Sequence, residues 1–212
     1  MKGELAIVAA RSSEGKSSLL LQTLISCGRN DVSALCFQLE MDEGQVLRRM
    51  LAAMTGIHFQ RFRHPECLTP VDMTRVEEAQ KELRQFPVWI EFPRSLNIQQ
   101  LVSRARIAKQ RHSVEFVGLD YLQKMEFTTD KPEQQYAAVG YAAKQLANLV
   151  KHEGMVVLAL SSLTEKSGRT KDSEPSMLDI RQSGDVQNEA GSMCCCIEKV
   201  PMRRTKASMS VA

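Results

Sequence analysis

Residues 10–18 of the chain read Ala10-Arg11-Ser12-Ser13-Glu14-Gly15-Lys16-Ser17-Ser18. An apolar run at 5–9 precedes this segment, and a leucine-rich run at 19–25 follows it. A strand, a small-residue loop, Gly-Lys-Ser and a helix form the context of a phosphate-binding P-loop, because loop N–H groups and the helix N-terminus converge on one anion. The segment therefore predicts a nucleoside triphosphate site.

The residue types within this segment indicate particular roles. Lys16 would reach the β- and γ-phosphates, and the Ser17 hydroxyl would bind Mg²⁺. The first position of the motif holds Ala10 where the usual pattern has glycine, so spacing alone leaves a second interpretation open. In that interpretation the segment is an ordinary turn between a strand and a helix, capped by Ser12 or Ser13.

Composition sets the outer limits of the interpretation. The chain has 212 residues, 43% of them hydrophobic, which suits a single α/β domain with one sizeable core. A net charge of +3 is only mildly basic, so any nucleic-acid surface must be local. The six cysteines lack the spacing of a zinc site, and we interpret them as small buried residues in a reducing cytosol. Without a membrane-length apolar run or a signal-peptide pattern, we expect a soluble intracellular protein.

Apolar strands alternate with amphipathic helices along the chain. Strands are predicted at 5–9, 32–39, 88–92, 114–119, 155–160 and 193–197. Helices are predicted after the P-loop, at 43–54, at 70–86 with Val71, Val76, Ala79 and Leu83 on its apolar face, after Asn97, and at 133–152. This alternation predicts a mostly parallel, doubly wound sheet with helices on both faces. The run at 155–160 is apolar on both faces and predicts a central strand.

Two carboxylates follow predicted strands. Because α/β sheets place their chemistry at the carboxyl ends of strands, Glu40 is a candidate general base for a water. Asp120 follows the strand at 114–119 and is a candidate for holding Mg²⁺ through water. Each has a structural alternative that the sequence leaves open. Glu40 would be a charge at the N-terminus of the next helix, and Asp120 a turn residue.

Several motifs in this order resemble the RecA-like motor domain of DnaB-type replicative hexameric helicases, over nearly the whole chain from Gly3 to about Glu198. Residues 10–17 resemble the family's P-loop, in which alanine stands first. Leu39-Glu40-Met41 resembles the segment with the glutamate that activates water, and Asp120-Tyr121-Leu122-Gln123 the segment with the Mg²⁺ aspartate. Leu178-Asp179-Ile180-Arg181-Gln182-Ser183-Gly184 resembles the loop that grips single-stranded DNA in the central channel.

The resemblance implies a RecA-like P-loop NTPase core that spans 1–212 as a single domain, without the family's N-terminal collar domain and linker helix. It implies ATP and Mg²⁺ as cofactors, with catalysis by Glu40 and Lys16. The nucleotide-binding residues would be Ser13, Gly15, Lys16, Ser17 and Ser18, the Mg²⁺ residues Ser17 and Asp120, and the DNA-binding residues Arg181, Gln182 and Gly184. A loop of this kind holds phosphates without reading bases.

The resemblance also implies an assembly and a setting. We expect a hexameric ring with ATP at each junction, stepping along single-stranded DNA to unwind duplex during replication. Primase or a helicase loader would be partners, and no membrane would be involved. The expected location is the cytoplasm or the nucleoid, with a mitochondrial or viral replisome as further settings.

Four departures from the family pattern bear on activity. Ser162 stands where the family has a glutamine that senses the γ-phosphate, and Glu165 where it has a basic residue. Glu14 puts a carboxylate into the P-loop, which would repel phosphates unless it points to solvent. The arginine finger of the family's late β-hairpin has no clear counterpart, and the collar is absent. Candidates for the finger are Lys199, Arg203 and Arg204.

These departures keep a second hypothesis open beside the DNA-translocating ATPase. In it, the chain is a non-catalytic RecA-like subunit that binds nucleotide or single-stranded DNA and assembles on a true motor. A third hypothesis, a P-loop kinase acting on a small molecule, is weaker because the sequence shows no arginine-rich lid over an acceptor pocket.

Overall fold

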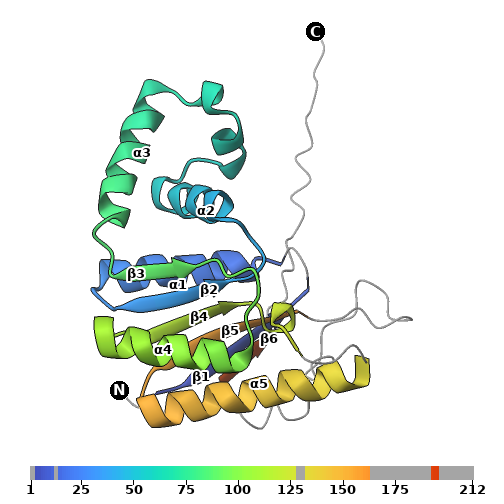
Figure 1. The fold of residues 1–212 in the computed structure, drawn as a ribbon. Helices are drawn as coiled ribbons and strands as arrows, with labels where there is room; N and C mark the ends of the chain where they lie inside the picture. Colours follow the sequence, from blue (N-terminus) through green and yellow to red (C-terminus); the bar gives the residue numbers. More distant parts are fainter. Residues whose placement is uncertain (1–2, 12–13, 128–131, 163–191, 196–212) are drawn as a thin grey trace.

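The computed structural model describes residues 3–11, 14–127, 132–162 and 192–195. Within these ranges, six parallel strands form one sheet in the order β3-β2-β4-β5-β1-β6 (Figure 1). The strands are β1 (Leu5–Ala10), β2 (Ala34–Gln38), β3 (Val88–Glu91), β4 (Phe116–Asp120), β5 (Val156–Ser162) and β6 (Ser192–Cys195). The predicted parallel sheet is confirmed, and β5 is the central strand that its apolar run indicated.

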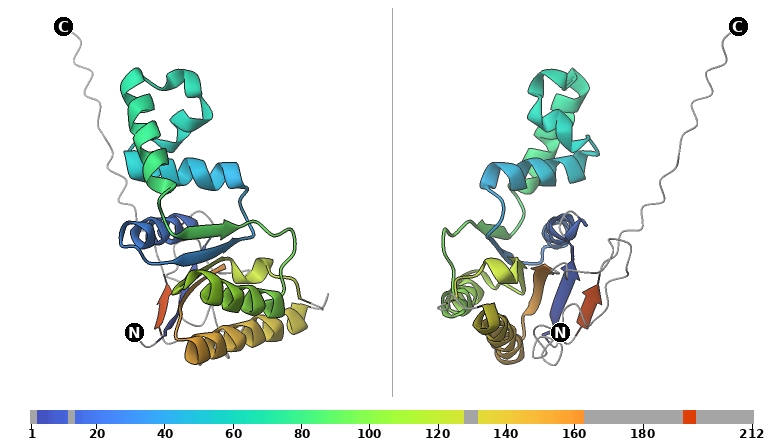
Figure 2. Two further views of the ribbon diagram at one scale, coloured as in Figure 1. Left: turned by 60° about the vertical axis from the view of Figure 1, so that its left-hand side comes forward. Right: turned by 90° about the vertical axis from the view of Figure 1, so that its right-hand side faces the viewer.

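Helices lie on both sides of this sheet. They are α1 (Lys16–Arg29), α2 (Glu43–Thr55), α3 (Pro70–Leu83), α4 (Ile98–His112) and α5 (Pro132–Glu153), with short 3-10 turns η1 (Phe59–Arg63), η2 (Pro65–Cys67) and η3 (Leu122–Lys124). Figure 2 shows α1 against one face of the sheet, and α4 and α5 against the other. Helices α2 and α3 stand beyond α1 as a helical arm (Figure 1).

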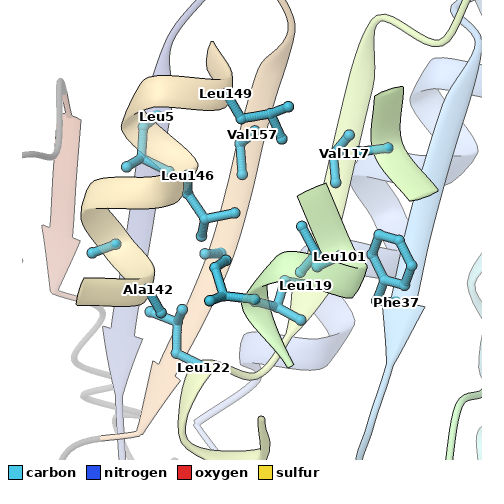
Figure 3. Packing of buried hydrophobic residues seen from close by; sticks show 14 of the residues in the cluster. Leu5, Phe37, Leu101, Val117, Leu119, Leu122, Ala142, Leu146, Leu149 and Val157 are labelled. Atoms are coloured by element: carbon cyan, nitrogen blue, oxygen red, sulfur yellow. The ribbon is translucent and has the colours of Figure 1, made fainter. Parts of the chain in front are cut away.

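The larger part of the core lies between the sheet and the pair α4 and α5. Leu101 of α4 and Leu146 of α5 are fully buried there against Leu119 of β4 (Figure 3). Large aliphatic side chains of this kind each contribute about 1.5–3 kcal/mol when removed from water. The face therefore acts as the main stabilising layer of the domain.

Helix α1 approaches the opposite face closely because β4 carries a glycine there. A Cβ atom built on Gly118 would lie 2.8 Å from Cδ1 of Leu20, closer than real Cβ contacts come. Leu20 and Leu24 pack onto Cys36 and Leu158 in the second buried cluster. This packing fixes the N-terminus of α1 at the carboxyl edge of the sheet, next to the P-loop.

The helical arm has a small core of its own. Leu51, Ile57, Val76 and Ala79 form a separate buried cluster between α2 and α3. Val71 was expected on the same apolar face but is 62% exposed, because it lies in the first turn of α3, beyond the residues that form the cluster. The arm thus rests on fewer buried side chains than the sheet does.

Local signals placed the helix starts correctly. Thr69 and Asp72 form a capping box at α3, and Asn97 and Gln100 form another at α4. The expectation for the end of α3 was wrong by three residues, since the α-helix ends at Leu83 and turn-type hydrogen bonds continue to Phe86.

The cysteine interpretation is only partly confirmed. Cys36 is buried and Cys27 half-buried, but Cys67 is exposed because it lies on η2, a short turn with no buried residue. Two arginines of α4 form ion pairs at the surface of the domain. Arg104 Nη1 lies 2.7 Å from Glu91 Oε2, and Arg106 Nε lies 3.0 Å from Glu153 Oε1.

Candidate nucleotide-binding site

Helix α1 begins at Lys16, and the residue before it has a left-handed backbone. Gly15 has φ 84° and ψ 8°, a conformation that residues with side chains rarely adopt. Its carbonyl oxygen accepts a hydrogen bond from the Leu19 N–H at 3.0 Å. The N-cap position thus belongs to Gly15, which carries no side chain, whereas Ser12 and Ser13, the alternative capping residues, lie outside the described residues. The first-turn N–H groups point toward the loop, as a phosphate site requires.

Charged side chains of the P-loop contact the loop backbone. Lys16 Nζ donates to the carbonyl oxygens of Ala10 and Arg11, each at 2.7 Å. Glu14 Oε2 accepts from the Arg11 N–H at 2.6 Å, so the Glu14 carboxylate faces the loop and not only solvent. Both contacts draw the loop together around the residues that would hold phosphate.

A cavity of about 520 Å³ opens at this point, at the carboxyl ends of β1, β2, β4 and β5. Its volume falls in the range of small-molecule sites. The lining residues are Gly15, Lys16, Ser17, Ser18, Glu40, Met41, Gln45, Arg49, Tyr121 and Ser162. Four of the predicted nucleotide-binding residues and the candidate base therefore share one cavity.

Glu40 lies at the cavity and outside the helix that follows it. The N-cap of α2 is Asp42, whose Oδ1 accepts from the Gln45 N–H at 2.7 Å. The capping role at this helix terminus therefore belongs to Asp42, while Glu40 lines the cavity. Glu40 lines the same cavity as Lys16, as a base for a phosphate-directed water requires.

Asp120 lies directly behind the cavity as the last residue of β4. Its side chain is 0% exposed, and Oδ2 accepts from Gln38 Nε2 at 3.0 Å. Oδ1 is also buried and has no hydrogen-bond partner among the described residues. A buried carboxylate oxygen without a donor is costly, and a metal-bound water would satisfy it.

The donor set fits Mg²⁺ better than a metal that needs a protein cage. Among the described residues, no group of three or more His, Cys, Asp or Glu side chains could hold a metal ion. Mg²⁺ retains several waters and binds through one or two protein groups together with phosphates. The Ser17 hydroxyl in the cavity and the Asp120 carboxylate behind it would supply those protein groups.

Tyr121 connects the two carboxylates electrostatically. Tyr121 lines the cavity, and partial burial raises the pKa of its phenol above the usual value. The negative charges of Glu40 and then Asp120 raise that pKa further. Glu40 and Asp120 thus both act on the Tyr121 phenol, although they follow or end two different strands.

Sequence reasoning missed two polar residues of the cavity. Gln45 and Arg49 lie four residues apart on one side of α2, and both line the cavity. The Arg49 guanidinium also lies 5.0 Å from the centre of the Phe59 ring, a cation–π contact. Their spacing after Glu40 is a usable signal, because a helix that starts beside a phosphate site turns its i and i+4 residues to the same side.

Other predicted residues lie outside the part of the chain that the structure describes. They are Ser13 of the P-loop, the candidate DNA-binding residues Arg181, Gln182 and Gly184, the departure Glu165, and the finger candidates Lys199, Arg203 and Arg204. Ser162 is described and lines the cavity.

A P-loop between the first strand and helix of a parallel sheet, with a glutamate and an aspartate at neighbouring strand ends, defines a RecA-like ATPase fold. Residues 1–210 match the family model of the DnaB-like helicase C terminal domain, and the chain belongs to this family.

Individual relatives agree with the family model. The chain is 29% identical over 190 residues to the replicative DNA helicase DnaB of Geobacillus stearothermophilus, covering 89% of this chain and 42% of that protein. It is 28% identical, with the same coverage, to the replicative DNA helicase DnaC of Bacillus subtilis. The chain thus spans less than half the length of these relatives.

Solved structures show the same fold. One solved ATPase domain matches with a TM-score of 0.85 and 21% identity, covering 98% of this chain and 74% of that one. A DnaB-like replicative helicase studied with primase matches with a TM-score of 0.85 and 21% identity, over 93% of this chain and 48% of that one.

No described helix of this chain has the length and apolarity to cross a membrane.

Proposed function

We propose that this chain is the motor domain of a ring-shaped DNA helicase that hydrolyses Mg²⁺-ATP at subunit junctions to move along single-stranded DNA. The observation that carries the proposal is the shared cavity of Lys16, Ser17 and Glu40 at the N-terminus of α1. Membership of the DnaB-like family supports the DNA-directed role.

Phosphate binding would exchange one set of contacts for another. Lys16 Nζ now donates to two carbonyl oxygens of the loop, and a triphosphate offers it stronger, charged acceptors. The N–H groups at the start of α1 and the Arg49 guanidinium add further positive potential along the cavity. Together these groups would hold the terminal phosphates between the P-loop and α2.

Hydrolysis would follow from the position of Glu40. A carboxylate in the cavity that the P-loop residues line can accept a proton from a water directed at the terminal phosphate. Bound Mg²⁺ would neutralise charge on the phosphate oxygens, with Ser17 and Asp120 holding the ion and its waters. Nearby Tyr121 adds no negative charge there, because a phenol ionises only at alkaline pH and the pKa of this one is raised further.

A DNA-directed motor of this family needs a subunit ring and a phosphate-binding loop. We assign DNA binding to Arg181, Gln182 and Gly184 and propose a homohexamer, with primase or a loader as partners of the whole helicase. Contacts of this kind go to phosphates, so affinity for oligo-dT would fall steeply with salt.

The nucleotide site is tested by calorimetric titration of the chain with Mg²⁺-ATPγS. Lys16→Ala removes a charged hydrogen-bond donor to phosphate, so we expect roughly 10–100-fold weaker binding. Lys81→Ala, on the exposed surface of α3, is the matched control and leaves affinity unchanged. Equal affinity of the Lys16→Ala variant and the parent chain would contradict the site.

The motor is tested separately by ATP turnover and by light scattering. Light scattering with an ATP analogue and oligo-dT should show a particle of six chains. In the separate turnover assay, we expect single-stranded DNA to stimulate the hydrolysis of ATP. A specific observation favours the rival, non-catalytic role, because Ser162 puts a short hydroxyl on the cavity wall at the end of β5. Nucleotide binding with no Glu40-dependent turnover in any assembled state would establish that rival.

A further inference from the structure

The end of β5 extends beyond the strand beside it. The last pair that joins β4 to β5 is Leu119 with Ala159, whereas β5 continues to Ser162. On its other side, β5 remains paired with β1, up to Ala10 with Ser162. The residue that β5 contributes to the cavity therefore has a strand neighbour only toward the P-loop.

The side chain of Gln123 takes the place of the missing strand. Its Oε1 accepts from the Ser162 N–H at 3.1 Å, and its Nε2 donates to the Ser162 carbonyl oxygen at 3.2 Å. Nε2 also donates to Ser161 Oγ at 2.8 Å. A primary amide carries a donor and an acceptor in one plane, as a peptide group does, so it can pair with both backbone groups of one residue. Gln123 lies in η3, three residues after Asp120.

We propose that Gln123 is a positioning residue that holds Ser162 against the terminal phosphate of the bound nucleotide. This inference rests on the proposed nucleotide site. Ser162 lies on the wall of the cavity that Lys16 and Glu40 also line, and its backbone is fixed between β1 and the Gln123 amide. The Ser162 hydroxyl thereby keeps its place at the phosphate, directly or through one water.

The arrangement also joins two parts of the site that come from different strands. Gln123 follows Asp120, the candidate Mg²⁺ residue, within the turn that leaves β4. Its amide contacts the end of β5, which lies between β4 and β1 in the sheet. The Gln123 amide therefore links the turn that follows Asp120 to the cavity residue Ser162.

A double-mutant cycle tests whether Gln123 acts through Ser162. The readout is the ratio of affinities for Mg²⁺-ATPγS and Mg²⁺-ADP, because only the first ligand has a terminal phosphate in reach. Ser162→Ala removes the hydroxyl and Gln123→Leu removes the amide, and we expect each to lower the ratio roughly 3–10-fold. In the double variant the ratio should equal that of Ser162→Ala alone.

Gln110→Leu, an exposed glutamine on α4, is the matched control and leaves the ratio unchanged. Ser161→Ala removes only one acceptor of the Gln123 amide, and we expect a smaller loss in the same direction. If Gln123→Leu does not fold, the affinity ratio of Ser161→Ala tests the inference in its place.

An unchanged ratio in both Gln123→Leu and Ser161→Ala would overturn the inference while Lys16-dependent binding stood. Losses that multiply in the double variant would also overturn it, because Gln123 would then act independently of Ser162. If the parent chain and Lys16→Ala bound Mg²⁺-ATPγS equally, the nucleotide site itself would be rejected and the inference with it.

Discussion

The face of the sheet under α4 and α5 and the carboxyl edge of the same sheet differ in how completely their groups are satisfied. Under α4 and α5, Leu101, Leu119 and Leu146 are fully buried among other aliphatic side chains (Figure 3). At the carboxyl edge, buried oxygens of Gln38 and Asp120 have no hydrogen-bond partner among the described residues. The buried face thus mainly stabilises the fold, and the carboxyl edge holds the polar groups of the candidate site. Substitutions in one region should therefore change stability, and substitutions in the other should change activity.

The largest expected effect is on turnover at the carboxyl edge. Glu40→Gln keeps the shape of the side chain but removes the proton acceptor, so we expect ATP hydrolysis to fall roughly 10²–10⁴-fold. Nucleotide affinity and thermal stability should stay close to those of the parent chain, because Glu40 is exposed and caps no helix. Glu77→Gln on α3 is the control. Full turnover in Glu40→Gln would exclude it as the base.

The opposite result is expected from the buried face. Leu146→Ala leaves a cavity among fully buried neighbours, and we expect a loss of about 2–5 kcal/mol in the free energy of unfolding. Affinity for Mg²⁺-ATPγS, measured at a temperature where the variant is folded, should change little. Chemical denaturation gives the first quantity and calorimetry the second. A large loss of affinity without loss of stability would show that the two regions are not separate.

The helical arm provides a smaller effect that is independent of both regions. Thr69→Ala removes the hydroxyl that accepts the hydrogen bond of the Asp72 N–H in the capping box at α3. We expect a loss of about 1 kcal/mol in the free energy of unfolding. Thr74→Ala, which removes an exposed hydroxyl of the same helix, is a matched comparison. If the two variants were equally stable, the capping box would contribute nothing.

The same box predicts how the arm responds to acid. Hydrogen bonds from Thr69 lower the pKa of Asp72 below its usual value, and the Arg61 guanidinium contributes further. A depressed carboxylate pKa stabilises the fold above the unfolded-state pKa, and that contribution is lost as pH falls through the folded pKa. The difference in stability between the parent chain and Asp72→Asn should therefore shrink on acidification.

The smallest effect reports on the geometry of the cavity. Burial and the charge of Glu40 raise the pKa of the Tyr121 phenol, so Glu40→Gln should lower that pKa toward the usual value. A pH titration of phenolate absorbance measures this pKa, with the titration of Tyr121→Phe subtracted to remove the other tyrosines. A group with a raised pKa contributes stability below its unfolded-state pKa and loses it as pH rises through the folded pKa. The Tyr121 contribution should therefore disappear at strongly alkaline pH.

The sequence was most informative where backbone chemistry is local. The strand and helix on either side of the P-loop, the helix starts at Thr69 and Asn97 and the central strand β5 followed from residue types and spacing, and the structure confirms them. The exposure of Val71 and Cys67 could not be read in this way, because periodicity indicates an apolar face but not how far neighbouring elements extend over it.

The site shows the same division. Lys16, Ser17 and Glu40 were predicted and share one cavity, whereas Asp120 lies behind it and contacts Gln38. Arg49 follows Glu40 at a helical spacing that could have indicated it. The Gln123 amide was missed as a site residue because its role depends on contacts with a segment distant in sequence. Spacing within a motif does not encode those contacts.

The central claim is that Lys16, Ser17, Glu40 and Asp120 serve one magnesium-bound triphosphate. Its most direct test is the affinity for ATPγS with Mg²⁺ and with EDTA, measured in the parent chain, Ser17→Ala and Asp120→Asn. We predict that Mg²⁺ tightens binding to the parent chain and that each substitution removes most of this gain. An undiminished gain in both variants would contradict the account.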